Sequence, residues 1–338
     1  MRIHDLTYDQ CVAQGVGPLL FPDRLTGDRV GEMKQICLQN IRNQVKLQHT
    51  LAIAWEGLKQ ADIQPVLMKG AGLAAYYPEP QRRQWGDIDL FVGKEQYHPA
   101  CAAMRKTFPE ALRFDEELDH YKHYNLIADG VAMEVHRVSM SLTHPRDIRR
   151  YEAFEREGME NSESVNLDGL TVRVPEVTFN VLMVFLHSWE HFLFAGVKLQ
   201  HLYDLFFLLR GEKERIDRLR LKRYLEALRL MEPWQLYMYA TVNLLGLAEE
   251  NAPFYTAACA ERAERMISDI LSGHSVAPSS PSGKKYRNRF LRKWQTMRTR
   301  MANAERIAQY SPAYARHMKA GVWLSGLSRI FAPDRHWE

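Results

Sequence analysis

The sequence predicts an α+β protein in which a small mixed β-sheet with flanking helices precedes a mostly helical C-terminal domain. Short β-rich runs punctuated by Gly, Pro and Asp occupy residues 61–175, and apolar residues recur at helical spacing on both sides of them. The 338 residues, 46 % hydrophobic and 25 % charged, suffice for about two domains with sizeable cores. We expect an N-terminal helical segment packed on the core at 1–60, the core at 61–175, a helical domain at 176–273, and a linker with a basic tail at 274–338.

The first elements follow from local spacing. From Arg29 to Leu58 apolar residues recur mostly every three or four positions, which predicts one amphipathic helix. The apolar run at 66–68 indicates a buried strand. The pattern then predicts a helix at 70–77 stopped by Pro78, a strand at 87–92 and a helix at 94–108.

Two Asp-Gly pairs predict β-hairpins, because a type I′ turn needs a positive φ at both of its central positions. Asp129-Gly130 would join strands at 123–128 and 131–138, and Asp168-Gly169 would join strands at 164–167 and 170–174. After Pro175 the period becomes helical, with apolar runs at 179–193, 199–209, 219–230 and 233–247.

The cysteines are scattered without the spacing of metal ligands: Cys11, Cys37, Cys101 and Cys259. This pattern argues against a disulfide framework and a zinc ribbon, and it fits a reducing cytoplasm. Residues 1–20 lack the continuous apolar core of a signal peptide, and the apolar stretch 177–197 is too interrupted by polar residues to span a membrane. We therefore expect a soluble cytoplasmic protein.

The net charge of +4 comes from one local patch. Residues 284–300 hold eight basic residues and no acid, so the rest of the chain carries 37 basic against 41 acidic residues, or −4. Tyr286, Phe290 and Trp294 are four apart, and a helix would place these aromatics on the protein with the cations outward. Contact of 284–300 with nucleic acid or a membrane surface is the alternative.

Acidic residues on the predicted strands point to metal chemistry. Asp87 and Asp89 leave the same face of one strand, about 6.6 Å apart along the chain at 3.3 Å per residue. Glu134 shares a face with His136 in the middle of a later strand. If the two strands are adjacent, the three acids can hold two Mg²⁺ ions about 3.5–4 Å apart, the arrangement that clamps a phosphoryl displacement. Alternatively, Glu134 faces solvent.

A strand, a turn and a helix precede these acids. Gly70 lets the backbone approach a ligand closely, the helix N-terminus at Ala71 offers N–H groups to a phosphate, and Lys69 adds a positive charge. Arg82 and Arg83, in the loop before Asp87, would pair with phosphate or with the acids, or face solvent.

A competing pattern lies in the helical half. His187, Glu190 and His191 match H-x-x-E-H, which on a helix can hold a catalytic zinc ion. The other interpretations are a buried polar helix face and a surface that faces the substrate.

The segments MKGAGLAAYYPEPQRRQWGDIDLFV (68–92) and MEVH (133–136) resemble the uncharacterised bacterial branch of the DNA-polymerase-β-like nucleotidyltransferases. The Lys-Gly turn follows that branch where better-known members have Gly-Gly or Gly-Ser. Arg83 stands where the branch has an arginine, and a looser likeness extends through residues 187–205.

The resemblance implies a nucleotidyltransferase fold for 61–175 and a role for each matching residue. Asp87 and Asp89 would bind both Mg²⁺ ions, and Glu134 would bind the ion that activates the acceptor hydroxyl. Further implied roles are nucleotide binding by Lys69, Gly70, Ala71 and Arg83, and a place on the substrate side for His136, His191 and His201. His191, His201 and Asp204 are similar to polar positions of the family's helical half, which would form the other wall of a cleft.

We therefore expect a Mg²⁺-dependent transferase that moves a nucleoside monophosphate from ATP or another nucleoside triphosphate to an unknown acceptor, releasing pyrophosphate. The acceptor would be a small molecule, a saccharide or a macromolecule. A metal-dependent glycosyltransferase with the Asp-x-Asp motif is one alternative, and it would not need Glu134. A non-enzymatic nucleic-acid-binding protein that uses 284–300 is the other.

Overall fold

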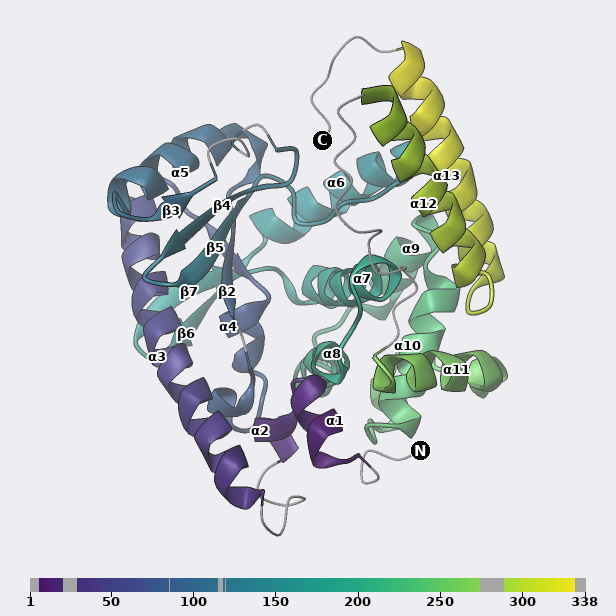
Figure 1. Cartoon of the computed structure of the whole chain (residues 1–338), viewed down its shortest axis with the longest axis horizontal. Helices are drawn as coiled ribbons and strands as arrows, with labels where there is room; N and C mark the ends of the chain where they lie inside the picture. Colours follow the sequence, from purple (N-terminus) through teal and green to yellow (C-terminus); the bar gives the residue numbers. More distant parts are fainter. Residues whose placement is uncertain are drawn as a thin grey trace. The chain divides into compact units, whose positions relative to one another are not determined.

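The structure is a computed structural model that describes residues 6–20, 29–84, 86–114, 118, 120–273 and 289–331. The chain divides into two compact units. The first, which we call the sheet unit, consists mainly of residues 7–141 and 155–180, and the second, the helical unit, mainly of 142–154 and 181–334. The predicted α+β fold is confirmed, with a mixed sheet, flanking helices and a mostly helical C-terminal part (Figure 1).

A five-stranded sheet with strand order β1-β2-β5-β4-β3 forms the centre of the sheet unit. Its strands are β1 (Val66–Met68), β2 (Asp87–Phe91), β3 (Leu112–Arg113), β4 (His123–Ala128) and β5 (Val131–His136). The sheet is mixed because β2 and β5 run parallel while the other neighbouring strands are antiparallel. A separate hairpin joins β6 (Glu163–Leu167) to β7 (Leu170–Val174).

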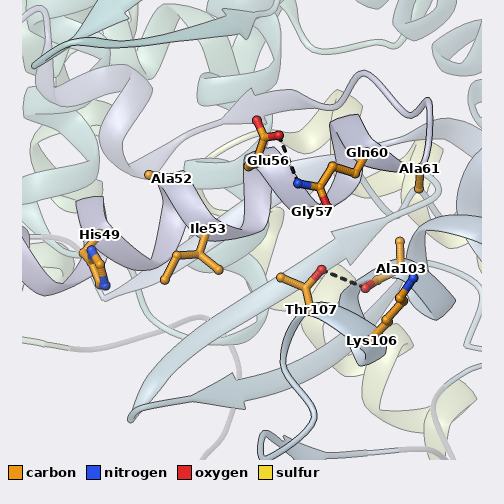
Figure 2. A pocket seen from close by; sticks show the side chains of 10 residues that line it. All are labelled: His49, Ala52, Ile53, Glu56, Gly57, Gln60, Ala61, Ala103, Lys106 and Thr107. Carbon is orange, nitrogen blue, oxygen red and sulfur yellow. Dashed lines mark hydrogen bonds between the residues drawn. The ribbon is translucent and has the colours of Figure 1, made fainter.

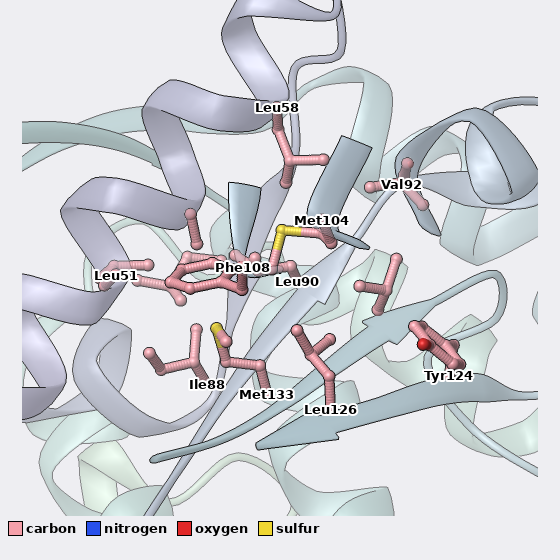
Figure 3. Packing of buried hydrophobic residues seen from close by; sticks show 14 of the residues in the cluster. Leu51, Leu58, Ile88, Leu90, Val92, Met104, Phe108, Tyr124, Leu126 and Met133 are labelled. Atoms are coloured by element: carbon pink, nitrogen blue, oxygen red, sulfur yellow. The ribbon is translucent and has the colours of Figure 1, made fainter. Parts of the chain in front are cut away.

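One face of the five-stranded sheet packs against two helices, α3 (Val30–Gln60) and α5 (Gly93–Thr107). Figure 3 shows Ile88 and Leu90 of β2 in this core with Leu51 of α3 and Met104 of α5. Because side chains alternate along a strand, burying Ile88 and Leu90 on this face directs Asp87 and Asp89 to the opposite one. The core thus determines which face of the sheet carries the acids.

Both predicted hairpins are confirmed. The turn residues Asp129 and Gly130 have φ of 50° and 73°, and Asp168 and Gly169 have φ of 49° and 94°. The predicted bounds shift slightly. The short helix α4 ends at Ala74 rather than at 77, and β5 ends at His136 rather than at 138.

The long helix α3 exists as predicted, but its N-terminal half buries a different face. Ile41 and Val45, which the apolar spacing placed on the core side, are 41 % and 62 % exposed. Asn40 and Gln44 are buried instead. Their amides donate to backbone carbonyls of the 80–83 segment, and this hydrogen bonding outweighs the apolar pattern in orienting this half of the helix.

The helical runs predicted after residue 176 are confirmed as α7 (Val177–Phe194), α8 (Leu199–Gly211), α9 (Arg218–Ala227) and α10 (Met231–Asn243). The remaining helices are α1 (Tyr8–Ala13), α2 (Gly17–Leu20), α6 (Pro145–Glu160), α11 (Ala260–Leu271), α12 (Arg289–Ile307) and α13 (Pro312–Phe331), with 3₁₀ turns at Pro80–Arg82, Glu249–Asn251 and Ala257–Cys259. Within the described ranges, none of the helices is both long and apolar enough to cross a bilayer.

The basic segment is described only in part. The predicted linker 274–283 and residues 284–288, with Tyr286, lie outside the described residues. Residues 289–300 belong to α12, as a helix was expected there. Trp294 is 50 % exposed, so the expectation that this aromatic packs on the protein is wrong.

Candidate active site

The parallel pairing of β2 with β5 brings two of the predicted acids side by side. Asp89 is the register partner of Glu134, and Asp87 is the partner of Ala132, two positions earlier on the same face. Asp89 is 2 % exposed, Glu134 is half-buried and Asp87 is exposed. Glu134 therefore shares the face of the sheet that carries Asp87 and Asp89.

Asp89 lies at the centre of a buried ionic cluster. Its Oδ1 is 2.7 Å from Lys69 Nζ and 2.9 Å from His136 Nε2. Burial disfavours the charged carboxylate, but the Lys69 charge and the bond to His136 prevail and hold the pKa of Asp89 well below its ordinary range. Asp89 is thus kept ionised in the interior by two cationic partners.

His136 connects the two strands. Its Nε2 lies 3.0 Å from Glu134 Oε2 as well as 2.9 Å from Asp89 Oδ1. Burial lowers the pKa of His136, yet the hydrogen bonds to Asp89 and Glu134 outweigh burial and leave that pKa raised. The imidazole is therefore placed to carry a positive charge between two carboxylates.

Asp87 has a different electrostatic environment. The charge of Asp89 and partial burial raise the pKa of Asp87 to about 6, while Lys69 and Arg83 oppose the shift. A cation bound beside Asp87 would neutralise the excess negative charge that raises this pKa.

The turn that supplies Lys69 has an unusual backbone. Lys69 has a φ of 50° and Gly70 a φ of 33°, so both residues lie in the left-handed region, which a non-glycine residue seldom adopts. This turn leads from β1 into α4 (Gly70–Ala74), and Ala71 is buried. Because Met68 pairs with Asp89, the turn brings the Lys69 ammonium directly to that carboxylate.

The loop before β2 is held from behind by α3. Gln44 Nε2 donates to the Arg83 carbonyl at 2.7 Å, and Asn40 Nδ2 donates to the Gln81 carbonyl at 2.7 Å. Arg83 is 6 % exposed and close enough to Asp87 to lower its pKa. Arg82 instead pairs with Glu79, Nη2 to Oε1 at 2.7 Å.

Comparison with known proteins shows which family the chain belongs to. A family model described as "Uncharacterised nucleotidyltransferase" matches residues 5–246. The chain belongs to this family. A solved structure titled "Crystal structure of an antigenic nucleotidyltransferase-like protein from Paracoccidioides brasiliensis" is similar at 16 % identity and a TM-score of 0.36, covering 62 % of this chain and 94 % of that one. No curated protein matches the sequence.

Among the described residues, the sequence reasoning missed a histidine that lies beside the predicted acids. His123 on β4 pairs with His136 on β5, and its Nδ1 lies 3.2 Å from Glu134 Oε2. Burial lowers the pKa of His123 to about 4, although the Glu134 charge opposes this. The sequence contained the signal for this pair. The two-residue turn at Asp129-Gly130 fixes the register of the hairpin, so that Ala128 pairs with Val131 and, five residues further along each strand, His123 pairs with His136.

The other two predicted histidines lie in the helical unit. His191 is on α7 and His201 on α8, with ring centroids 4.8 Å apart. His187 of the H-x-x-E-H pattern joins them, 4.5 Å from His191. In the helical unit, His187, His191 and His201 form one of the groups that could hold a metal ion, and Glu190 does not belong to it.

A surface depression of about 660 Å³ lies elsewhere on the sheet unit. Figure 2 shows it between α3 and α5, lined by residues such as Ile53, Gln60 and Lys106. These helices cover the apolar face of the sheet, and none of the predicted site residues lines the depression. It is therefore separate from the cluster of acids.

Proposed function

We propose that this nucleotidyltransferase transfers a nucleoside monophosphate from a nucleoside triphosphate to an acceptor hydroxyl or similar nucleophile, with Mg²⁺ bound by Asp87, Asp89 and Glu134. The observation that carries the proposal is the register that makes Asp89 the neighbour of Glu134. The acceptor in this proposal is a small molecule, a saccharide or a macromolecule, and ATP is one candidate donor. The proposal also includes a cytoplasmic location, which agrees with the free cysteines.

The donor set suits hard divalent cations, because carboxylate oxygens with substrate phosphates are the ligands that Mg²⁺ prefers. Asp87, whose pKa is raised by the charge of Asp89, is the carboxylate that gains most from a nearby cation. Asp89 and Glu134 already share His136, so a cation there competes with the imidazole. Two bound Mg²⁺ ions would supply charge neutralisation for the triphosphate and activation of the acceptor hydroxyl.

The residues of the turn would bind the donor. Lys69, now paired with Asp89, would contact the phosphates through its ammonium if a cation took over that carboxylate, and the backbone of Gly70 and Ala71 lines the same turn. Arg83, held by α3, places a second positive charge beside Asp87. These groups would hold the triphosphate so that its α-phosphorus faces the acceptor.

The reaction is then a single displacement. The acceptor hydroxyl gives up its proton to solvent as its oxygen forms a bond to the α-phosphorus. The bond from that phosphorus to the β-phosphate oxygen breaks, and pyrophosphate leaves with that electron pair. Glu134, whose Oε2 lies 3.0 Å from His136 Nε2, would bind the ion that activates the acceptor hydroxyl.

The test is whether nucleotide binding depends on Mg²⁺. Calorimetric titration of the full chain with ATP, GTP, CTP and UTP, with and without Mg²⁺, measures this binding. We expect at least one triphosphate to bind more tightly with Mg²⁺ than without it, and Asp87→Asn, Asp89→Asn and Glu134→Gln to remove that difference. Asp129→Asn is the matched control, because Asp129 is an exposed acid in a turn that also accepts Asn.

Pyrophosphate release in the presence of candidate acceptors then tests the transfer itself. Triphosphate binding that does not depend on Mg²⁺ or on the three acids would refute the proposal. A protein that binds a sugar nucleotide through Asp87 and Asp89, with Glu134→Gln unaffected, would be the glycosyltransferase instead.

A further inference from the structure

Three histidines converge at the corner between α7 and α8 in the helical unit. His187 and His191 are four residues apart on α7 and so share one face of that helix, while His201 lies in the first turn of α8. The ring centroids are 4.5 Å apart for His187 and His191, 4.8 Å for His191 and His201, and 5.8 Å for His187 and His201. All three side chains are partly exposed, so an ion can reach them from solvent.

The spacing of these rings matches that of a metal centre. When three imidazoles bind one tetrahedral ion through nitrogens at 2.0–2.1 Å, their ring centres lie about 5.2 Å apart and their ligating nitrogens about 3.4 Å apart. The nitrogens of the three histidines already lie within 4.8 Å of one another. Small χ rotations would close this gap.

The backbone fixes the corner that carries the rings. The amides of Ala195 and Gly196 donate to the His191 carbonyl at 2.9 and 2.7 Å, and Gly196 turns the chain with a φ of 91°. The short loop between α7 and α8 is thus held by backbone hydrogen bonds to His191, and it fixes where α8 begins relative to the end of α7.

The backbone also engages one nitrogen of the third ring. His201 Nδ1 accepts a hydrogen bond from the Lys198 N–H at 3.1 Å and also lies 3.3 Å from the Lys198 carbonyl oxygen. Metal binding through Nε2 needs the other tautomer, in which Nδ1–H donates to the Lys198 carbonyl and Nε2 carries the lone pair. Metal-binding histidines commonly have such a second bond, which fixes the tautomer.

We propose that His187, His191 and His201 bind a divalent transition-metal ion, zinc above all, with a fourth position left for water or an exogenous ligand. Three neutral imidazoles suit Zn²⁺ and its neighbours but not Mg²⁺, which prefers oxygen ligands. The site is therefore chemically distinct from the carboxylates of the sheet unit, and the ion joins the C-terminal end of α7 to the start of α8.

A second histidine cluster of the helical unit lacks this geometry. The rings of His144 and His317 are stacked face to face, with an interplanar angle of 16°, and His317 Nε2 already bonds to Asp147 Oδ2 at 2.5 Å. Stacked rings direct their nitrogens side by side rather than toward a common point, which leaves the α7–α8 corner as the better site.

Zinc titration of the metal-free full chain against a chromophoric chelator tests the proposal. We expect one zinc equivalent whose Kd rises more than about 100-fold in His191→Ala and in His201→Gln, since losing a ligand costs more than losing an outer-shell partner. Co²⁺ in place of zinc is expected to give the visible absorption of a tetrahedral site, lost in the same variants. His49→Ala, at an exposed position on α3, is the matched control and retains both signals.

A comparison variant separates this site from the group His123, Glu134 and His136, whose ligand atoms also lie within 4.8 Å of one another. Glu134→Gln is expected to leave the zinc signal of the α7–α8 corner intact. Zinc lost in Glu134→Gln but retained in both histidine variants would overturn the proposal, and so would a wild-type chain without a zinc equivalent. Far-UV circular dichroism confirms that each variant is folded.

Discussion

At the scale of single residues, the site depends on an unusual sharing of charge. Asp89 is almost fully buried, yet it is paired on one oxygen with both Lys69 and His136. Removing one member of a buried ionic group leaves the others charged without a partner, which is costly. Under the proposed function, Asp89 would therefore have two separable roles, one in stability and one in cation binding.

Asp89→Asn is expected to lower the free energy of unfolding by about 3 kcal/mol, because the buried Lys69 and His136 lose their common counter-charge. Urea denaturation measures this loss. Adding Lys69→Met to Asp89→Asn is expected to recover part of the stability without recovering Mg²⁺-dependent nucleotide binding. Equal stability of Asp89→Asn and wild type would contradict the assigned pairing.

The raised pKa of Asp87 predicts a pH dependence. Because this pKa is about 6 against an ordinary value of 3.8, Asp87 is protonated below about pH 6 and Mg²⁺ must displace that proton. Mg²⁺ affinity is therefore expected to fall as the pH drops below about 6, by up to about tenfold per pH unit. Mn²⁺ binding monitored by electron paramagnetic resonance measures this, and a Mn²⁺ affinity that does not change across about pH 6 would contradict the assigned role of Asp87.

The same shift acts with the opposite sign on the metal-free fold. A carboxyl whose folded-state pKa is raised favours folding in its protonated form, so its contribution is present at low pH. That contribution is expected to be lost as the pH rises between about 4 and about 6. Thermal unfolding of Asp87→Asn, compared with the wild type across that window, isolates it.

At the scale of elements, α3 acts as the support of the loop that carries Arg83. Its buried polar face binds backbone carbonyls of that loop, whereas its C-terminal half packs apolar side chains on the sheet. A single helix thereby performs two kinds of packing, and the polar part bears on the site.

Gln44→Leu is expected to reduce the free energy of unfolding by about 1–3 kcal/mol, because the carbonyls of Gln81 and Arg83 lose a buried donor. We also expect weaker triphosphate binding, since the Arg83 segment loses its anchor. Denaturation and calorimetry measure the two effects. Val45→Ala, one position along and 62 % exposed, is the control and is expected to change stability by less than about 0.5 kcal/mol.

At the scale of the whole molecule, segments far apart in the chain pack directly on each other in the helical unit, as Gly321 and His144 do. The ideal Cβ of an alanine at Gly321 of α13 would lie 3.0 Å from His144 Cα and 3.2 Å from the His144 backbone nitrogen. Backbone atoms cannot move aside as a flexible side chain can. The absence of a side chain at 321 is thus a condition for this close packing.

Gly321→Ala is therefore expected to destabilise the protein by about 1–3 kcal/mol through overpacking, despite the better helix propensity of alanine. The matched control is Gly31→Ala in α3, where an added Cβ meets nothing within 4 Å, and it is expected to stabilise slightly. Scanning calorimetry compares the two variants. An unchanged or higher melting temperature for Gly321→Ala would show that the two segments can separate without cost.

Local rules made much of this protein readable in advance. Asp-Gly turns require positive φ, and alternation assigns strand faces, so both hairpins and the shared face of Asp87 and Asp89 followed from spacing alone. The same register reasoning, carried one step further, would have found His123. Such features depend on neighbours in the chain, which the sequence displays directly.

Only the tertiary structure decided how those faces are occupied. The spacing of α3 did not reveal that Asn40 and Gln44 would be buried, because their partners are carbonyls some forty residues away. The sequence also did not reveal that Lys69 and His136 both pair with Asp89, or that His201 lies beside His187 and His191. Hydrogen bonds and charges between distant segments are strong only where packing removes water, and packing is a property of the folded chain.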